Sequence, residues 1–120
     1  MYKRQVQGDG GLYGTASDYG LFLRMLLNRG TLNGKRILSE KSVRRMLVIQ
    51  TGNVVVKPQQ SADQALSRNF PFGAGKDRWG LGFQLAADRR PNRRSPGSGT
   101  WAGIFNTHFF IDPSLSLIHI

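Results

Sequence analysis

The sequence predicts an α+β fold in which helices pack on an antiparallel sheet. Two segments of the first half carry apolar residues at helical spacing, and each follows a residue that can cap a helix. The last third of the chain instead alternates apolar side chains in short runs bounded by glycine or proline, which is typical of strands. Because helices precede strands rather than alternating with them, the order favours α+β over α/β.

Length and composition restrict the class of protein. With 120 residues the chain is at most one domain, and without cysteine it has neither disulfides nor thiolate chemistry. No apolar run approaches the length of a membrane span, and no apolar signal region follows Met1. We therefore expect no contact of this chain with a membrane, while its localisation stays undetermined.

Four arginines cluster around a Pro-Asn pair in a chain of net charge +10: Arg89, Arg90, Arg93 and Arg94. Such a cluster can meet nucleic acid or an acidic surface. However, aromatic residues do not interleave it, and no nucleic-acid motif accompanies it. A solvated loop between two strands is the favoured interpretation, with no nucleic-acid partner. A basic nucleic-acid module, detectable by salt-sensitive DNA binding, is the weakest alternative.

The two ends of the chain can be encoded by one DNA sequence and its reverse complement. Residues 115–120 can be encoded by CTG TCT CTT ATA CAC ATC, which resembles a transposase end sequence used in sequencing libraries. Its reverse complement, with GTG read as a start codon, encodes residues 1–5. We therefore expect residues 1–5 and 115–120 to be adapter-derived and residues 6–114 to be a gene fragment. A natural strand at the C-terminal end is the alternative, and different codons in the source DNA would favour it.

The first helix is predicted between Thr15 and Gly30. Thr15 can cap it, and Asp18 can return the bond in a capping box. Gly30 has the position of a C′ glycine. Gly20 inside the helix costs about 1 kcal/mol relative to alanine, which a close contact at that point would explain. The apolar stripe comprises Tyr19, Phe22, Leu23, Leu26 and Leu27.

A turn and a second helix follow. The Asn33-Gly34 pair between short apolar runs predicts a small hairpin or a tight connector. Ser39 then caps a helix over residues 40–49, which carries Glu40 in its first turn. The inner face of this helix holds Val43, Met46 and Leu47.

The middle of the chain is less regular. Prolines and glycines in residues 51–77 predict a long surface excursion, with a short strand at residues 54–56 and a helical turn at residues 61–68. Residues 79–85 read as one strand, because every second side chain is large and apolar. The two glycines between them leave the other face open to close packing.

Residues 99–113 organise the second half. They read as two strands, or one strand with a break, and Asp112-Pro113 ends the run because proline cannot donate to a ladder. Trp101 is followed by two small residues, Ala102 and Gly103. Small residues are typical of backbone that passes close to a ligand or another strand. An ordinary core strand with a bulge is the alternative.

Three segments in this order resemble the serine β-lactamase-related family, which includes class C β-lactamases, penicillin-binding proteins and β-lactamase-like esterases. Residues 10–19 (G-G-L-Y-G-T-A-S-D-Y) resemble its G-G-L-x-S-T-A-x-D-Y segment. Residues 31–39 are similar to its turn and second helix, and residues 79–83 and 101–113 resemble its late strands. The resemblance implies a C-terminal fragment of the β-lactamase/transpeptidase-like fold.

The resemblance also implies a chemistry, which is acyl transfer through an acyl-serine from an S-x-x-K motif, with protons handled by a Y-x-N or S-x-N motif. The chain has no S-x-x-K and no Y-x-N, so we expect the fragment itself to be inactive. The implied parent is a serine hydrolase that cleaves ester or amide bonds, such as those of β-lactams or D-amino-acid peptides, without a metal or other cofactor. A non-catalytic β-lactamase-like binding protein is the alternative.

The third family motif, K-T-G or W-x-G, corresponds to Trp101, Ala102 and Gly103, which are the expected substrate-binding residues. By the same resemblance the backbone N–H of Ile104 donates to the oxyanion. A tryptophan in place of lysine supplies no positive charge, which favours neutral esters or amides over anionic ligands. The expected partner is a small-molecule ester, amide or peptidoglycan-like substrate. Asn106 departs from the glycine of many relatives. His108 reads as an ordinary strand residue rather than a base.

Overall fold

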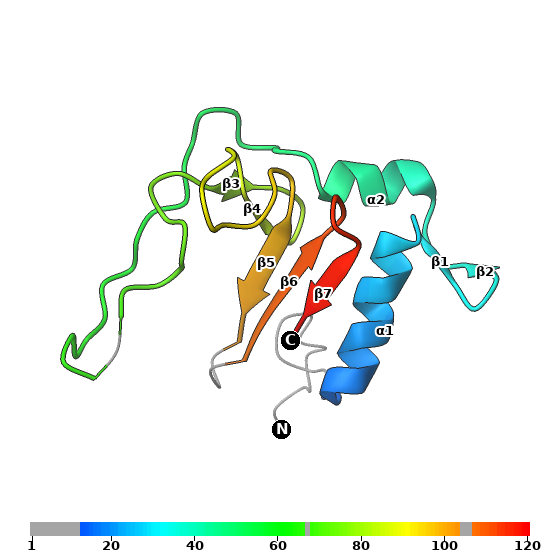
Figure 1. The fold of residues 1–120 in the computed structure, drawn as a ribbon, viewed down its shortest axis with the longest axis horizontal. Coiled ribbons are helices and arrows are strands. Elements are labelled where there is room, and N and C mark those ends of the chain that lie inside the picture. The colour runs from blue at the N-terminus through cyan, green and yellow to red at the C-terminus, as the bar shows by residue number, and fades with distance from the viewer. Residues whose placement is uncertain (1–12, 67, 104–106) are drawn as a thin grey trace, which may run out of the picture.

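The computed structural model describes residues 13–66, 68–103 and 107–120. Two helices lie against one face of an antiparallel sheet, so the expected α+β class is confirmed (Figure 1). In chain order the elements are α1 (Ala16–Leu27), β1 (Thr31–Leu32), β2 (Lys35–Arg36), α2 (Glu40–Met46), β3 (Arg78–Trp79), β4 (Gln84–Leu85), β5 (Gly99–Ala102), β6 (His108–Asp112) and β7 (Leu117–His119).

The main sheet has the order β3-β4-β5-β6-β7, and every neighbouring pair is antiparallel. Its longest pairing joins β5 to β6, where Trp101 lies opposite Phe109 and Gly99 opposite Ile111. Ile111 is fully buried in the core that the helices cover, and Phe109 packs against that core. The core between the helices and the sheet contains Leu23, Met25, Leu26, Val43, Phe83, Leu85 and Ile111.

Helix α1 begins as predicted and ends one residue earlier than predicted. Thr15 and Asp18 form the capping box. At the other end Asn28 is the C-cap, and Arg29 takes the left-handed C′ position with φ 52°. The N–H groups of Arg29 and Gly30 donate to Leu26 and Met25, which is a Schellman motif with glycine at C″. Gly30 is required for packing, because a Cβ there would lie 2.1 Å from the Leu38 carbonyl oxygen.

The hairpin and the second helix agree closely with the sequence. Asn33 and Gly34 have φ values of 49° and 75°, as a two-residue hairpin turn requires. Ser39 accepts a hydrogen bond from the backbone N–H of Ser42 and caps α2. The helix ends at Met46, earlier than the expected residue 49, and Val43 is buried against α1 and the sheet.

The single strand expected over residues 79–85 is wrong, because this segment is the hairpin of β3 and β4. Arg78 pairs with Leu85, and Gly82 turns the chain with φ 82°. Alternation survives only in part, since Phe83 is buried while Leu81 is 47% exposed. Close packing is found at Gly80, where a Cβ would lie 2.3 Å from the Met46 carbonyl oxygen.

The long excursion over residues 51–77 is confirmed, but its expected strand and helical turn are not formed. Residues 54–56 lie outside the sheets, and residues 61–68 carry a turn without a helix in their described part. One isolated bridge joins Gln59 to Phe70. Val56 is nonetheless buried, and its N–H donates to the Asp77 carbonyl, which ties the excursion back to its own end.

Residues 117–119 take part in the fold as β7 at the edge of the sheet. Ile118 lies opposite Ile111 and packs against the core. An apolar alternating segment can fill an open sheet edge whatever its origin, since the backbone of β6 supplies the hydrogen bonds. The adapter origin of the two ends therefore stays a prediction. In the described part of the chain, neither helix combines the length and apolar character of a membrane span.

Gly20 offers a test of the fold. The close contact expected there is not found, because a Cβ would meet only Ile120 Cδ1 at 3.8 Å. We expect Gly20→Ala to raise the free energy of unfolding by about 1 kcal/mol, as in other helix interiors. Gly80→Ala should lower it by roughly 1–3 kcal/mol, because its Cβ meets a backbone oxygen. Urea unfolding measures both, and a destabilising Gly20→Ala would contradict the packing described.

The capping box makes stability depend on pH. Backbone and hydroxyl hydrogen bonds from Thr15 lower the pKa of the Asp18 carboxyl. A lowered pKa stabilises the fold above the unfolded value of about 3.9, and this contribution is lost as the pH falls through the folded value. Asp18→Asn should therefore be less stable than wild type at neutral pH and should approach it in acid. A pH-independent difference in urea unfolding would argue against the box.

Candidate functional site

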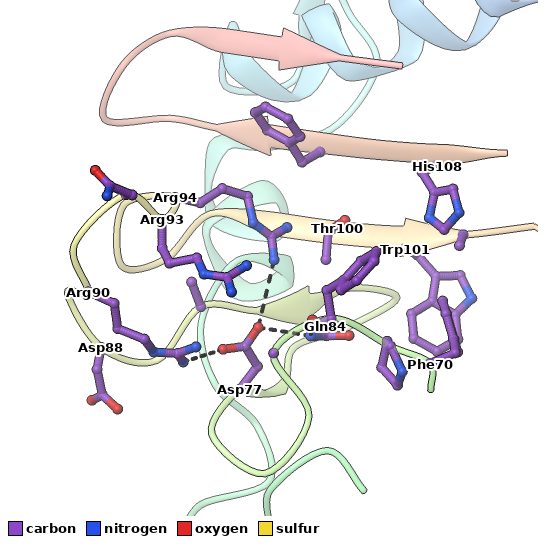
Figure 2. Close-up of a pocket in the computed structure, with 17 residues that line it drawn as sticks. Phe70, Asp77, Gln84, Asp88, Arg90, Arg93, Arg94, Thr100, Trp101 and His108 are labelled. Carbon is purple, nitrogen blue, oxygen red and sulfur yellow. Dashed lines mark hydrogen bonds and ion pairs between the residues drawn. The ribbon is translucent and has the colours of Figure 1, made fainter. Parts of the chain in front are cut away.

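A half-open cavity of about 410 Å³ lies on the side of the sheet opposite the core. Three segments wall it: the end of the excursion, the arginine loop between β4 and β5, and one face of β4, β5 and β6 (Figure 2). Thr100 and Phe110 are cross-strand partners, as are Ala102 and His108, so these four side chains share that face. The cavity has the size of a small-molecule site.

Asp77 is the buried polar centre of the cavity. It is 1% exposed, and Arg90 Nη2 lies 2.5 Å from Oδ1. On the other oxygen, Gln84 Nε2 donates at 2.8 Å and Arg94 Nη2 lies 3.7 Å away. Gln84 also donates to the carbonyl of Phe72 at 2.6 Å. A buried carboxylate is stable only when paired in this manner, so Asp77 fixes the positions of its partners.

Local backbone geometry brings Asp77 to this place. The residue ends a tight turn in which its N–H donates to the Gly73 carbonyl at 2.9 Å. Gly73 has φ 93°, and a Cβ on it would lie 2.1 Å from Asp77 Oδ2 and 2.9 Å from Gln84 Nε2. Only glycine therefore allows the carboxylate and the amide to meet at this point.

The solvated-loop interpretation of the arginine cluster is right for Arg89 and wrong for Arg90 and Arg94. The cluster does connect two strands, but Arg90 and Arg94 turn inward and their side chains are only 20% and 23% exposed. Burial lowers the pKa of Arg94, the Asp77 charge opposes that shift, and the neighbouring arginines add to it. The Arg94 guanidinium also lies 5.9 Å from the Phe110 ring centroid, in cation–π contact.

A second buried carboxylate anchors the end of the arginine loop. Asp112 accepts hydrogen bonds from the backbone N–H groups of Ser95, Ser114 and Leu115. Burial alone would raise the pKa of Asp112, but these donors together lower it. The carboxylate therefore ties the loop to the turn after β6, and Arg94 is held next to the anchored Ser95.

The opposite end of the cavity is aromatic. Trp101 packs edge-on against Trp79, with ring centroids 4.9 Å apart, and against Phe70 at 5.3 Å. The Phe70 and His108 ring centroids are 6.5 Å apart. Figure 2 shows Phe70, Trp101 and His108 at one end, with the arginines and Asp77 at the other. The site therefore offers an apolar half and a charged half.

The structure brings two of the expected substrate-binding residues to the cavity. Trp101 and Ala102 both line it. Gly103 follows the strand, and a Cβ there would lie 2.5 Å from Thr107 Oγ1, so a larger residue would need the Thr107 side chain to shift. The expected oxyanion donor Ile104 and the departing Asn106 lie outside the described residues. His108 also lines the cavity, in addition to its place on β6.

The backbone hydrogen-bonding groups of Ala102 point away from β6. Gln84 pairs with Thr100, and β4 begins only there because the chain before it turns at Gly82. Hydrogen-bonding directions alternate along a strand, and the Gly103 N–H bonds toward β6 by donating to Thr107. The N–H and C=O of Ala102 therefore point to the opposite edge, beyond the end of β4.

Two polar side chains of the cavity are engaged within the protein. The Thr100 hydroxyl donates to the Phe109 carbonyl. The Asp77 carboxylate is paired with Arg90 and Arg94. Over the ranges that the structure describes, no group of three or more His, Cys, Asp or Glu residues could hold a metal ion.

Sequence reasoning missed the excursion's contribution to the site. Asp77 lies in a charged run, Lys76-Asp77-Arg78, that reads as exposed. Nothing local pairs it with Gln84 and Arg90. The one available signal was Gly73, four residues earlier, which indicates a turn but not its partner.

Comparison with known proteins identifies relatives but no family, since no family model matches the sequence. The chain is similar to Protein Rv1367c of Mycobacterium tuberculosis strain H37Rv, with 34% identity over 119 residues, 91% of this chain and 26% of the relative. The same values hold for Uncharacterized protein MT1414 of strain CDC 1551. The chain thus spans about a quarter of the length of these curated relatives, and neither name states an activity.

Removal of the Asp77 charge tests the centre of the site. Asp77→Asn leaves two partly buried arginines without their counterion, and we expect the free energy of unfolding to fall by about 3 kcal/mol. Asp88→Asn is the matched control, because Asp88 lines the same cavity but is exposed, and it should change stability by less than about 0.5 kcal/mol. Equal effects of the two variants on the free energy of unfolding in urea would contradict the role of Asp77 as the buried counterion of the arginines.

Proposed function

We propose that this chain is the substrate-contacting, C-terminal part of a serine hydrolase of the β-lactamase-related type. The parent enzyme cleaves ester or amide bonds through an acyl-serine, and its nucleophile lies in a part of the protein that this chain does not contain. The fold of the fragment is then part of a β-lactamase/transpeptidase-like domain. The 120-residue chain has no hydrolytic activity by itself.

One observation carries the proposal: the W-A-G strand, which resembles the family's third motif, supplies Trp101 and Ala102 to the wall of the cavity. The N–H and C=O of Ala102 face the edge beyond the end of β4, where a substrate backbone could pair as an added strand. The lengths of the relatives are compatible with a nucleophile motif elsewhere, since this chain matches about a quarter of each.

In this assignment the N–H of Ile104 is the oxyanion donor of the fragment. Loss of one such donor typically costs about 2.7–4 kcal/mol of transition-state stabilisation. Trp101 packs beside the reacting group and orients it through apolar contact. The acyl-serine, the base and the second oxyanion donor come from the rest of the parent enzyme.

A specific observation favours a second candidate, a non-catalytic binding protein. Within the described residues the cavity holds charged and aromatic side chains but no nucleophile paired with a base. Such a protein would bind the same ligands and release them unchanged.

Covalent labelling separates the two candidates. Full-length Protein Rv1367c is incubated with a fluorophosphonate probe and, separately, with benzylpenicillin, and intact-protein mass spectrometry detects any adduct. We expect one adduct on one serine with at least one probe. Heat-denatured Rv1367c and the 120-residue chain are the controls and should stay unmodified. No adduct with either probe on the folded relative would favour the binding protein.

A further inference from the structure

The charges of the cavity do not balance. Three arginines line it, against the carboxylates of Asp77 and the exposed Asp88. Asp77 is closely paired with Arg90 at 2.5 Å, while Arg94 is 3.7 Å away. Among the described residues no ion pair holds Arg93, whose side chain runs toward Arg94 and Asp77 in Figure 2. The cavity thus has a surplus of positive charge at one end.

Guanidinium groups at such a place suit a planar anion. Arginine donates two parallel N–H groups, which match the two oxygens of a carboxylate better than a point charge does. Arg94 is held by Asp77 and by the Phe110 ring, so its position is fixed before any ligand arrives. A fixed cation loses less conformational entropy on binding than a mobile one.

The other end of the cavity selects an apolar group. Phe70, Trp101 and His108 gather there, and Phe110 joins them to the arginine end. A free phosphate ion would use the cationic end only and would leave the aromatic wall uncovered. A ligand that fills both halves carries one anionic group and one apolar body.

We propose that this cavity binds a small carboxylate with an aromatic or branched apolar body, held by Arg93 and Arg94 at one end and by Trp101, Phe70 and Phe110 at the other. The observations on the cavity alone support binding of such a ligand. The further statement that this ligand is the substrate or product of the parent enzyme rests on the proposed function.

An anionic ligand differs from the neutral substrates that we expect from tryptophan at position 101. Recognition of a negative charge need not come from the residue that replaces the family's lysine. Here the arginine loop supplies the positive charge, and Trp101 contacts the body of the ligand.

The test compares two ligands of the same shape, 4-tert-butylbenzoate and 4-tert-butylbenzamide, titrated calorimetrically into the 120-residue chain. The benzoate should bind at least about tenfold more tightly, which corresponds to about 1.4 kcal/mol. Arg93→Gln should weaken the benzoate about tenfold and leave the benzamide unchanged. Arg89→Gln is the matched control, because Arg89 is an exposed arginine of the same loop outside the cavity, and it should change neither ligand more than twofold.

Arg93 is exposed and has no ion pair in the described structure, so its replacement leaves the fold intact. Equal affinity for the acid and the amide, equal effects of the two variants, or no binding of either ligand would overturn the proposal. Inorganic phosphate binding as tightly as the benzoate would overturn the role of the aromatic wall. Because the titration needs no nucleophile, its failure is distinct from the absence of an acyl adduct on Rv1367c.

Discussion

The buried carboxylate of Asp77 is the interaction on which the site depends. A desolvated charge must be paired, and here the pairing draws Arg90 and Arg94 inward from a loop that would otherwise be solvated. Gln84 connects the same carboxylate to the sheet and to the excursion. One group therefore joins three segments that are distant in sequence, and the space between them is the cavity.

The two faces of the sheet have different tasks. The face that carries Phe109 and Ile111 packs against the helices and supplies the core. The face that carries Thr100, Ala102 and Phe110 is left to the cavity. Strand alternation makes this division possible, since the same β5–β6 pair packs the core on one side and walls the cavity on the other. The sheet forms one wall of the cavity, whereas loops supply its charged wall.

Features set by neighbouring residues were predictable from the sequence, and features set by distant ones were not. The capping box at Thr15 and the Asn33-Gly34 turn need only local chemistry, and both are present. The alternation of residues 79–85 fits a strand or a hairpin, and only the turn at Gly82 decides between them. Trp101 and Ala102, which a motif marks, line the cavity, and their part in substrate binding stays a prediction. The partners of Asp77 carry no motif, since tertiary folding alone brings them together.

In the proposed function, the strand with Trp101 and Ala102 lines the binding site of a larger hydrolase. A crystal structure of full-length Protein Rv1367c after reaction with benzylpenicillin tests it most directly. The account predicts an acyl-serine whose carbonyl oxygen lies within hydrogen-bonding distance of the strand that aligns with Gly99–Ala102 or of the residues directly after it. An acyl group bound at a site remote from that strand would contradict the account.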